Sequence, residues 1–234
     1  MSLRGAKRRS NLTNVKRRRL LRQHFVLPRN DMLKRIGLFG GTFNPVHIGH
    51  IKMAEAARKE YKLSYVYFIP CGIPPHKSKK ELLPAKLRYK LVSEAIKGKK
   101  HFKILDIEIK KKKPAYTINT VLSLRGALAT KQSSAAKTKV RLLSQGFVLP
   151  CNDVELYFLI GQDEFEKLHT WNKANELAKL ITFLVLPRVG ARPMCLPKPS
   201  RIKGLKWHLV HTKPINISST EIRKKIKIKS HLSL

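Results

Sequence analysis

Two histidines with the spacing of one helical turn offer the clearest chemistry in this chain. His47 and His50 stand three residues apart, shortly after the glycine pair 40–41 and the hydroxyl of Thr42. The apolar run 36–39 precedes the glycines, a pattern typical of a buried strand that ends in a tight turn. Free backbone N–H groups and the positive end of a helix dipole converge at such a strand–turn–helix junction, and histidines add further donors. The segment is therefore predicted to hold phosphate groups.

Other interpretations of a histidine pair are possible. An isolated histidine near a helix start is more often a cap or a surface residue than a catalyst, and His-x-x-His can also bind zinc. No third or fourth ligand with regular spacing lies near His47 and His50, which disfavours zinc. The whole string GGTFNPVHIGH (40–50) favours phosphate binding. It resembles the signature of the nucleotidyltransferase superfamily that carries the T/HxGH motif.

A second candidate anion site lies near the end of the chain. In NISSTEIR (216–223), the hydroxyls of Ser219 and Thr220 and the guanidinium of Arg223 fall at an expected helix start. Helix starts rich in serine are common in proteins. This segment therefore supports phosphate binding only in combination with GGTFNPVHIGH. The pair suits nucleotidyl transfer, in which a phosphate attacks the α-phosphorus of ATP and pyrophosphate leaves. Positioning and charge neutralisation supply most of the catalysis of such a reaction.

Further motifs narrow the resemblance to the bacterial nicotinate-mononucleotide adenylyltransferases. They are IPPHK (73–77), PAYT (114–117), IGQDEF (160–165) and HTW (169–171). The resemblance covers residues 33–125 and 154–226. It implies transfer of AMP from ATP to nicotinate mononucleotide, giving nicotinate adenine dinucleotide and pyrophosphate in NAD biosynthesis.

The resemblance also implies roles for individual residues. The implied catalytic residues are His47, His50, Lys77 and Arg223. The implied ATP-binding residues are Gly40, Gly41, Thr42, Phe43, His47, His50, Gly161, Asp163, Arg188, Ser219, Thr220 and Arg223. The implied nicotinate mononucleotide-binding residues are Asn44, Lys77, Arg88, Tyr116, Thr117, Trp171 and Asn172. Among these, Trp171 is expected to stack on the pyridine ring.

Three features depart from the family pattern. Asn44 stands where many members have Asp, and Asn172 stands where an aromatic residue is frequent. The segment 126–153 is not part of the pattern.

Strand-like and helix-like segments alternate along the core. Strands are expected at 36–39, 65–69, 102–109, 157–160, 181–186 and 207–210, with helices from 48, at 83–96, from 114, around 163–168, at 175–180 and from 217. This alternation predicts a doubly wound parallel α/β sheet. The resemblance implies that the sheet is that of the Rossmann-like nucleotidyltransferase fold. Every motif named above falls just after a strand or at a helix start. One composite site at the carboxyl ends of the strands is therefore expected.

Two segments are expected to lie outside this core. Residues 1–31 form a basic extension with no sustained periodicity and are predicted to be disordered, so the nucleotidyltransferase domain spans 32–234. Residues 126–153 are predicted to be an inserted surface loop. Both hold a copy of one sequence, because 19–31 and 141–153 agree at ten of thirteen positions. We interpret the copies as passengers, and Met32 as an alternative start of the working enzyme.

The composition limits the remaining possibilities. The chain of 234 residues has 50 Lys or Arg against 14 Asp or Glu, a net charge of +36, which predicts attraction to phosphates or nucleic acid. Its three cysteines are scattered, and no apolar run has the length of a membrane span, so a cytoplasmic protein without membrane contact is expected. The basic N-terminus offers non-specific contact with nucleic acid. The oligomeric state stays open.

Alternatives remain for the molecule that accepts AMP and for the class of protein. Nicotinamide mononucleotide or phosphopantetheine could replace the acid nucleotide, and a basic nucleic-acid-binding protein could use this fold. The sequence contains no cluster of carboxylates of the kind that would bind a metal ion. Mg²⁺ is therefore expected to arrive with ATP, bound mainly by its phosphates.

Overall fold

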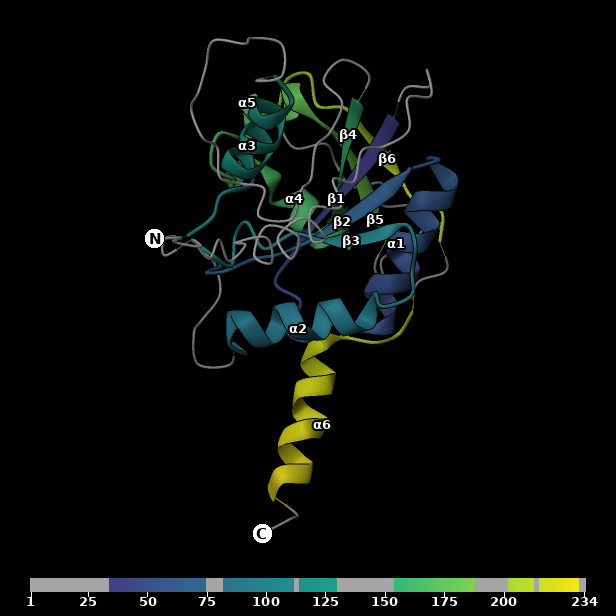
Figure 1. Ribbon diagram of the computed structural model, residues 1–234, viewed down its shortest axis with the longest axis vertical. Helices are drawn as coiled ribbons and strands as arrows, with labels where there is room; N and C mark the ends of the chain where they lie inside the picture. The colour runs from purple at the N-terminus through teal and green to yellow at the C-terminus, as the bar shows by residue number, and fades with distance from the viewer. Residues whose placement is uncertain are drawn as a thin grey trace, which may run out of the picture.

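The computed structural model describes residues 34–74, 82–111, 114–129, 154–187, 202–212 and 215–231 (Figure 1). The extension 1–31, the part of the expected loop from residue 130 to 153, and the predicted site residues Lys77 and Arg188 lie outside the described residues.

The sheet has six parallel strands in the order β3-β2-β1-β4-β5-β6. The strands are β1 (Lys34–Gly41), β2 (Tyr65–Pro70), β3 (Phe102–Ile104), β4 (Val154–Gly161), β5 (Thr182–Leu186) and β6 (Trp207–Leu209). This is the doubly wound order, in which the winding direction reverses between β1 and β4. The predicted fold class is confirmed.

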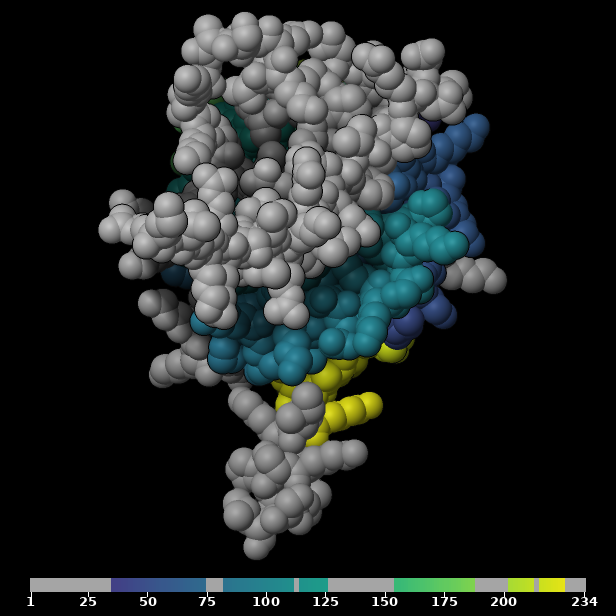
Figure 2. Space-filling model, in the orientation of Figure 1, coloured from purple at the N-terminus to yellow at the C-terminus, as the bar shows by residue number. Residues whose placement is uncertain are grey.

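Helices cover both faces of the sheet (Figure 1). The helices are α1 (Ile48–Glu60), α2 (Ala85–Ala95), α3 (Thr117–Ala129), α4 (Gln162–Glu166), α5 (Ala174–Leu180) and α6 (Ser219–His231), with a 3₁₀ turn η2 at Leu168–Thr170. One hydrophobic core lies between the sheet and α3, α4 and α5, and a second lies between the sheet and α1 and α2. The last helix, α6, projects away from the body, and its coloured residues emerge below α2 in the view of Figure 2.

The two cores explain why the strands are apolar at successive positions. In β1, Ile36 and Leu38 face the core under α3, whereas Phe39 faces the core under α1. A parallel strand buried on both faces has no solvent side, so its sequence is a continuous apolar run. No helix in the described part of the chain is long and apolar enough to cross a membrane.

Two predicted boundaries are wrong. The third strand was expected over 102–109, but β3 ends at Ile104, and the chain turns so that Ile107 and Glu108 are buried. The inserted loop was expected from residue 126, but residues 126–129 belong to the last turn of α3. Alanine and leucine dominate 127–129 and favour the helix.

Candidate active site

The site begins where β1 ends. A Cβ atom on Gly40 would lie 2.8 Å from the ring of Phe158, and one on Gly41 would lie 3.1 Å from the ring of Phe43. The glycine pair therefore lets two aromatic rings pack directly against the backbone. Phe43 is buried in the left-handed region with φ 47°, and its ring meets the His50 ring edge-on at a centroid distance of 5.2 Å.

The two histidines lie together at the start of α1. His47 is the N-cap residue, and the centroids of the two imidazole rings are 3.8 Å apart. The backbone N–H of His47 donates to Nδ1 of His50 at 3.2 Å. Because Nδ1 of His50 accepts this hydrogen, the proton of the neutral ring sits on Nε2. His50 therefore has a defined tautomer with Nε2 as its donor.

Burial gives His47 a distinct chemical state. Its Nδ1 is buried against the first turn of α1, where the His47 side chain faces the backbone N–H of His50 in a capping-box arrangement. Burial also lowers the pKa of His47 below its ordinary value of 6.5, which favours the neutral ring at pH 7.

The start of α6 packs against the loop that carries the histidines. Ser218 and Glu221 cap the helix reciprocally: the Glu221 N–H donates to Ser218 Oγ at 3.2 Å, and the Ser218 N–H donates to Glu221 Oε2 at 3.3 Å. Ser219 Oγ donates to the carbonyl oxygen of Pro45 at 2.9 Å.

Arg223 adds a second contact between the two motifs. Its Nη1 donates to the carbonyl oxygen of Asn44 at 2.8 Å, and its Nη2 donates to Thr220 Oγ1 at 3.3 Å. The two predicted anion-binding motifs, more than 160 residues apart in sequence, are thus adjacent in the structure.

A cavity of about 330 Å³ opens at the carboxyl ends of β1 and β4, at the point where the winding of the sheet reverses. Ligands of doubly wound sheets bind at this position, in pockets of roughly 300–1,000 Å³. Ten predicted site residues line it: Gly40, Gly41, Thr42, Phe43, His50, Tyr116, Thr117, Gly161, Trp171 and Asn172. Histidine and aromatic groups that are predicted to contact different substrates therefore share one cavity.

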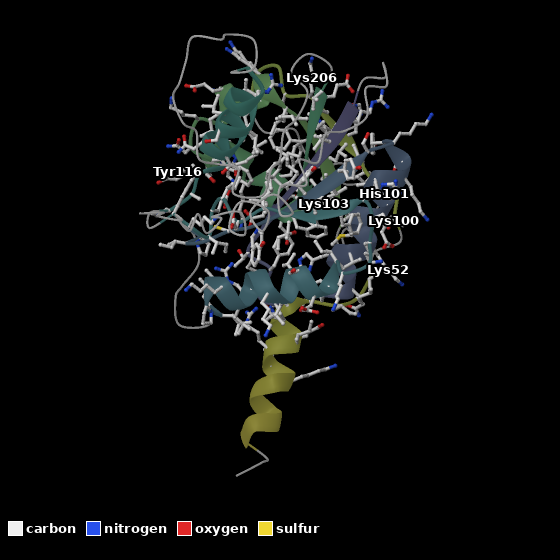
Figure 3. The ribbon with its side chains drawn as sticks, viewed as in Figure 1. Lys52, Lys100, His101, Lys103, Tyr116 and Lys206 are labelled. Carbon is white, nitrogen blue, oxygen red and sulfur yellow. The ribbon has the colours of Figure 1, made fainter. Side chains whose placement is uncertain are left out.

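The wall opposite the histidine loop comes from α3 and η2. Trp171 follows η2 and stands edge-to-face on Phe158, with ring centroids 6.0 Å apart and an interplanar angle of 90°. Thr117 is the first residue of α3. Tyr116 is 40% exposed and points outward, on the opposite side of the view from Lys52 and Lys100 (Figure 3).

Gly161 contributes open space to the cavity. A Cβ atom there would meet nothing within 4 Å, and its φ of −68° suits any residue. Neither packing nor backbone geometry of the described residues therefore requires glycine. Asp163 lies in the first turn of α4 outside the cavity lining, where its neighbour Glu164 faces the cavity instead.

The structure gives Arg88 a different place from the predicted one. The sequence suggested a side chain available to the acceptor nucleotide, but Arg88 is fully buried in α2 and outside the cavity lining. Its guanidinium donates to four carbonyl oxygens, those of Leu83 (2.9 Å), Thr42 (2.7 Å), Cys71 (2.6 Å) and Gly72 (2.8 Å). Arg88 thus holds the loops after β1 and β2 together.

Asn44 also acts within the protein framework. Its Oδ1 accepts the backbone N–H of Leu83 at 2.9 Å, and its side chain does not line the cavity. A short side chain with an oxygen suffices for this contact.

Sequence reasoning missed a polar cluster in the cavity wall. Glu108 is 7% exposed, and Thr120 Oγ1 donates to its Oε1 at 2.8 Å. Glu108, Thr120 and Cys71 all line the cavity. The strand expected over 102–109 gave no indication that Glu108 takes part in a buried cluster. The sequence indicated this polar cluster only through the spacing of Thr117 and Thr120, which places both on one face of α3.

Fold and site define a nucleotide-binding α/β protein whose anion site lies at a strand–turn–helix junction. A family model described as cytidylyltransferase-like matches residues 38–225. Curated relatives named probable nicotinate-nucleotide adenylyltransferase include one from Dehalococcoides mccartyi, 34% identical over 196 residues, which cover 82% of this chain and 85% of the relative. Another, from Shouchella clausii, is 35% identical over 194 residues, which cover 83% of this chain and 85% of that relative. The chain belongs to the nicotinate-nucleotide adenylyltransferase family of cytidylyltransferase-like proteins.

A solved structure agrees in fold. The Plasmodium falciparum nicotinic acid mononucleotide adenylyltransferase complexed with NaAD has a TM-score of 0.56 and 18% identity, and the match covers 82% of this chain and 83% of that one.

Proposed function

We propose that this protein transfers AMP from ATP to nicotinate mononucleotide, giving nicotinate adenine dinucleotide and pyrophosphate. The observation that carries the proposal is the single cavity at the reversal point of the sheet, lined by both His50 and Trp171. A donor for phosphate oxygens and an aromatic face for a pyridine ring are thereby within one binding space. Family membership supports the same reaction.

The reaction requires positioning rather than covalent help. A phosphate oxygen of the acceptor forms a bond to the α-phosphorus of ATP, and the bond from that phosphorus to the bridging oxygen of pyrophosphate breaks. The attacking phosphate is already ionised, so no general base is needed. We assign Nε2 of His50 and the ring of His47 as hydrogen-bond donors to phosphate oxygens as negative charge builds on them.

The triphosphate would extend toward α6. Ser219, Thr220 and Arg223 stand against the histidine loop, and Arg223 brings a positive charge to this edge of the site. We therefore propose these residues as partners of the β- and γ-phosphates. Lys77 stays a predicted partner of the reacting phosphates, and Arg188 a predicted neighbour of adenine.

We propose that Mg²⁺ enters this site together with ATP. Within the described ranges, no three His, Cys, Asp or Glu side chains group closely enough to hold a metal ion, and the carboxyls that line the cavity are Glu108 and Glu164. We propose that phosphate oxygens and water hold the ion. When bound, Mg²⁺ neutralises phosphate charge.

We also propose that the reaction takes place in the cytoplasm.

The test is release of pyrophosphate from ATP and Mg²⁺ with three acceptors in parallel: nicotinate mononucleotide, nicotinamide mononucleotide and phosphopantetheine. We expect turnover with the first, and a fall of roughly 10²- to 10³-fold in kcat for His50→Ala, the usual effect of removing a transition-state donor. Turnover with phosphopantetheine alone would show that the acceptor is wrong. Absence of turnover with all three, in folded protein, would overturn the proposed function.

A further inference from the structure

Glu108 is a buried carboxyl that the phosphate chemistry does not use. Glutamate is almost never buried unless its charge has a partner. Here the side chain is 7% exposed, it lines the cavity shared by His50 and Trp171, and no ion pair within the described part of the chain includes it. Thr120 Oγ1 donates to its Oε1, which fixes the direction of the carboxyl.

Among the described residues, the groups around Glu108 do not neutralise its charge by contact. The Cys71 thiol hydrogen-bonds to it from the end of β2, and Lys111 acts on it only through its charge. The backbone of Gly72 packs so closely that a Cβ there would lie 2.3 Å from the Glu108 carbonyl oxygen. The other titratable groups that line the cavity are His50, Tyr116, Glu164 and Cys71.

The acceptor nucleotide of the proposed function brings a positive charge into this cavity. Its pyridine nitrogen is bonded to ribose and is therefore a permanent cation, whether the ring carries a carboxylate or an amide. An anion and an aromatic face are the two protein groups that stabilise a cation away from water. The cavity offers both, in Glu108 and in Trp171.

We propose that the carboxylate of Glu108 is the counter-charge of the acceptor's pyridinium ring, and that it makes the cavity selective for cationic rings. The inference rests on the proposed function, because it assumes that a pyridine nucleotide enters this cavity. Thr120 and Cys71 hold the carboxylate in place, and Trp171 covers a face of the ring.

This role has a consequence for pH. Burial raises the pKa of Glu108 above its ordinary value of 4.5, against the opposing effects of the hydrogen bond from Thr120, the charge of Lys111 and the hydrogen bond from Cys71. The cationic ring favours the ionised form, so binding lowers the pKa again. Affinity for a pyridinium acceptor therefore increases as pH rises through the pKa of Glu108 in the free protein.

The experiment compares two acceptors on two proteins. The acceptors are nicotinate mononucleotide and its C-nucleotide analogue, in which a neutral 3-carboxyphenyl ring replaces the pyridinium ring. The variant is Glu108→Gln, which keeps an oxygen for Thr120 and loses the charge. We expect its dissociation constant for nicotinate mononucleotide to rise roughly 10- to 100-fold and that for the neutral analogue to change less than about 3-fold. KM for ATP should stay unchanged.

The matched control is Glu155→Gln. This residue lies near the start of β4, at the opposite end of the strand from Gly161, and pairs with Arg35 at 3.1 Å. The Glu155→Gln substitution also removes one negative charge from the protein, but away from the cavity. Its dissociation constants for nicotinate mononucleotide and for the neutral-ring analogue should therefore match those of the wild type.

Wild-type protein gives a second test that no folding defect can disturb. The ratio of affinities for the pyridinium and neutral-ring acceptors should rise as pH increases above the ordinary glutamate pKa of 4.5, because their phosphates titrate alike and only one ring is charged. Equal losses for both acceptors in Glu108→Gln, or a ratio independent of pH, would overturn the inference. A wild-type protein that turns over neither pyridine nucleotide would instead overturn the proposed function.

Discussion

At the scale of single residues, His47 keeps its position at the start of α1 because residue 49 has no side chain. A Cβ on Gly49 would lie 2.9 Å from Nδ1 of His47, closer than real Cβ contacts allow. The imidazole therefore folds back over the first turn of the helix, where its ring stacks near that of His50. The glycine of the motif positions the histidine rather than contacting a substrate.

We predict that Gly49→Ala displaces the His47 ring and lowers kcat for pyrophosphate release by roughly tenfold or more, the effect of losing one aligned donor. Because alanine favours helix over glycine, the melting temperature should fall little. The control is Ile48→Ala, since the Ile48 side chain is 49% exposed and its loss should leave kcat unchanged. Equal rates in Gly49→Ala and wild type would show that His47 needs no such support.

At the scale of elements, the site depends on loops that a buried arginine connects. Arg88 enters from α2 and donates to carbonyl oxygens in the loops after β1 and β2. Ser219 and Arg223 bring the start of α6 to the first of these loops. The sheet supplies the strand ends, but these side chains set the distances between the loops that carry the chemistry.

We predict that Arg88→Lys lowers the free energy of unfolding by about 2–4 kcal/mol, because an ammonium group cannot reach the carbonyl oxygens of three separate segments together. Urea unfolding followed by circular dichroism measures the change. Arg125→Lys is the matched control: Arg125 is exposed and donates to the Leu180 carbonyl, so about 1 kcal/mol or less is expected. A similarly small loss for Arg88→Lys would contradict the connecting role.

At the scale of the whole molecule, the net charge of +36 exceeds what two nucleotide substrates require. Residues 1–35 alone hold 12 Lys or Arg and one acidic residue, Asp31. On the described surface, Lys52, Lys100 and His101 lie on the α1 side of the molecule, away from Tyr116 (Figure 3). None of these three basic residues is among those that line the cavity.

We predict that a chain that starts at Met32 loses most of its sequence-independent RNA binding and keeps its rate of pyrophosphate release. Filter binding at about 50 and 200 mM salt measures the first, since phosphate contacts make affinity strongly salt-dependent. RNA binding as strong as that of the full chain would exclude the N-terminal segment and point to lysines of the folded surface, such as Lys52 and Lys100.

The order of the elements and the two predicted phosphate-binding motifs can be read from the amino-acid sequence alone. A run of apolar residues before Gly40, the HxGH string and the Ser218 cap are local signals, because each depends on residues within a few positions of one another. The doubly wound sheet then follows from alternation alone, and placing the motifs at the strand ends follows from the sheet.

Which side chains contact one another depends on how the segments pack. The family resemblance implied that Arg88 contacts the acceptor nucleotide, yet packing of three segments encloses it. Glu108 has the spacing of an exposed strand residue, yet the early end of β3 turns it against Thr120. Such contacts join residues between 12 and 46 positions apart. Local periodicity carries no information about them, because the distance between segments is set by the packing of helices on the sheet.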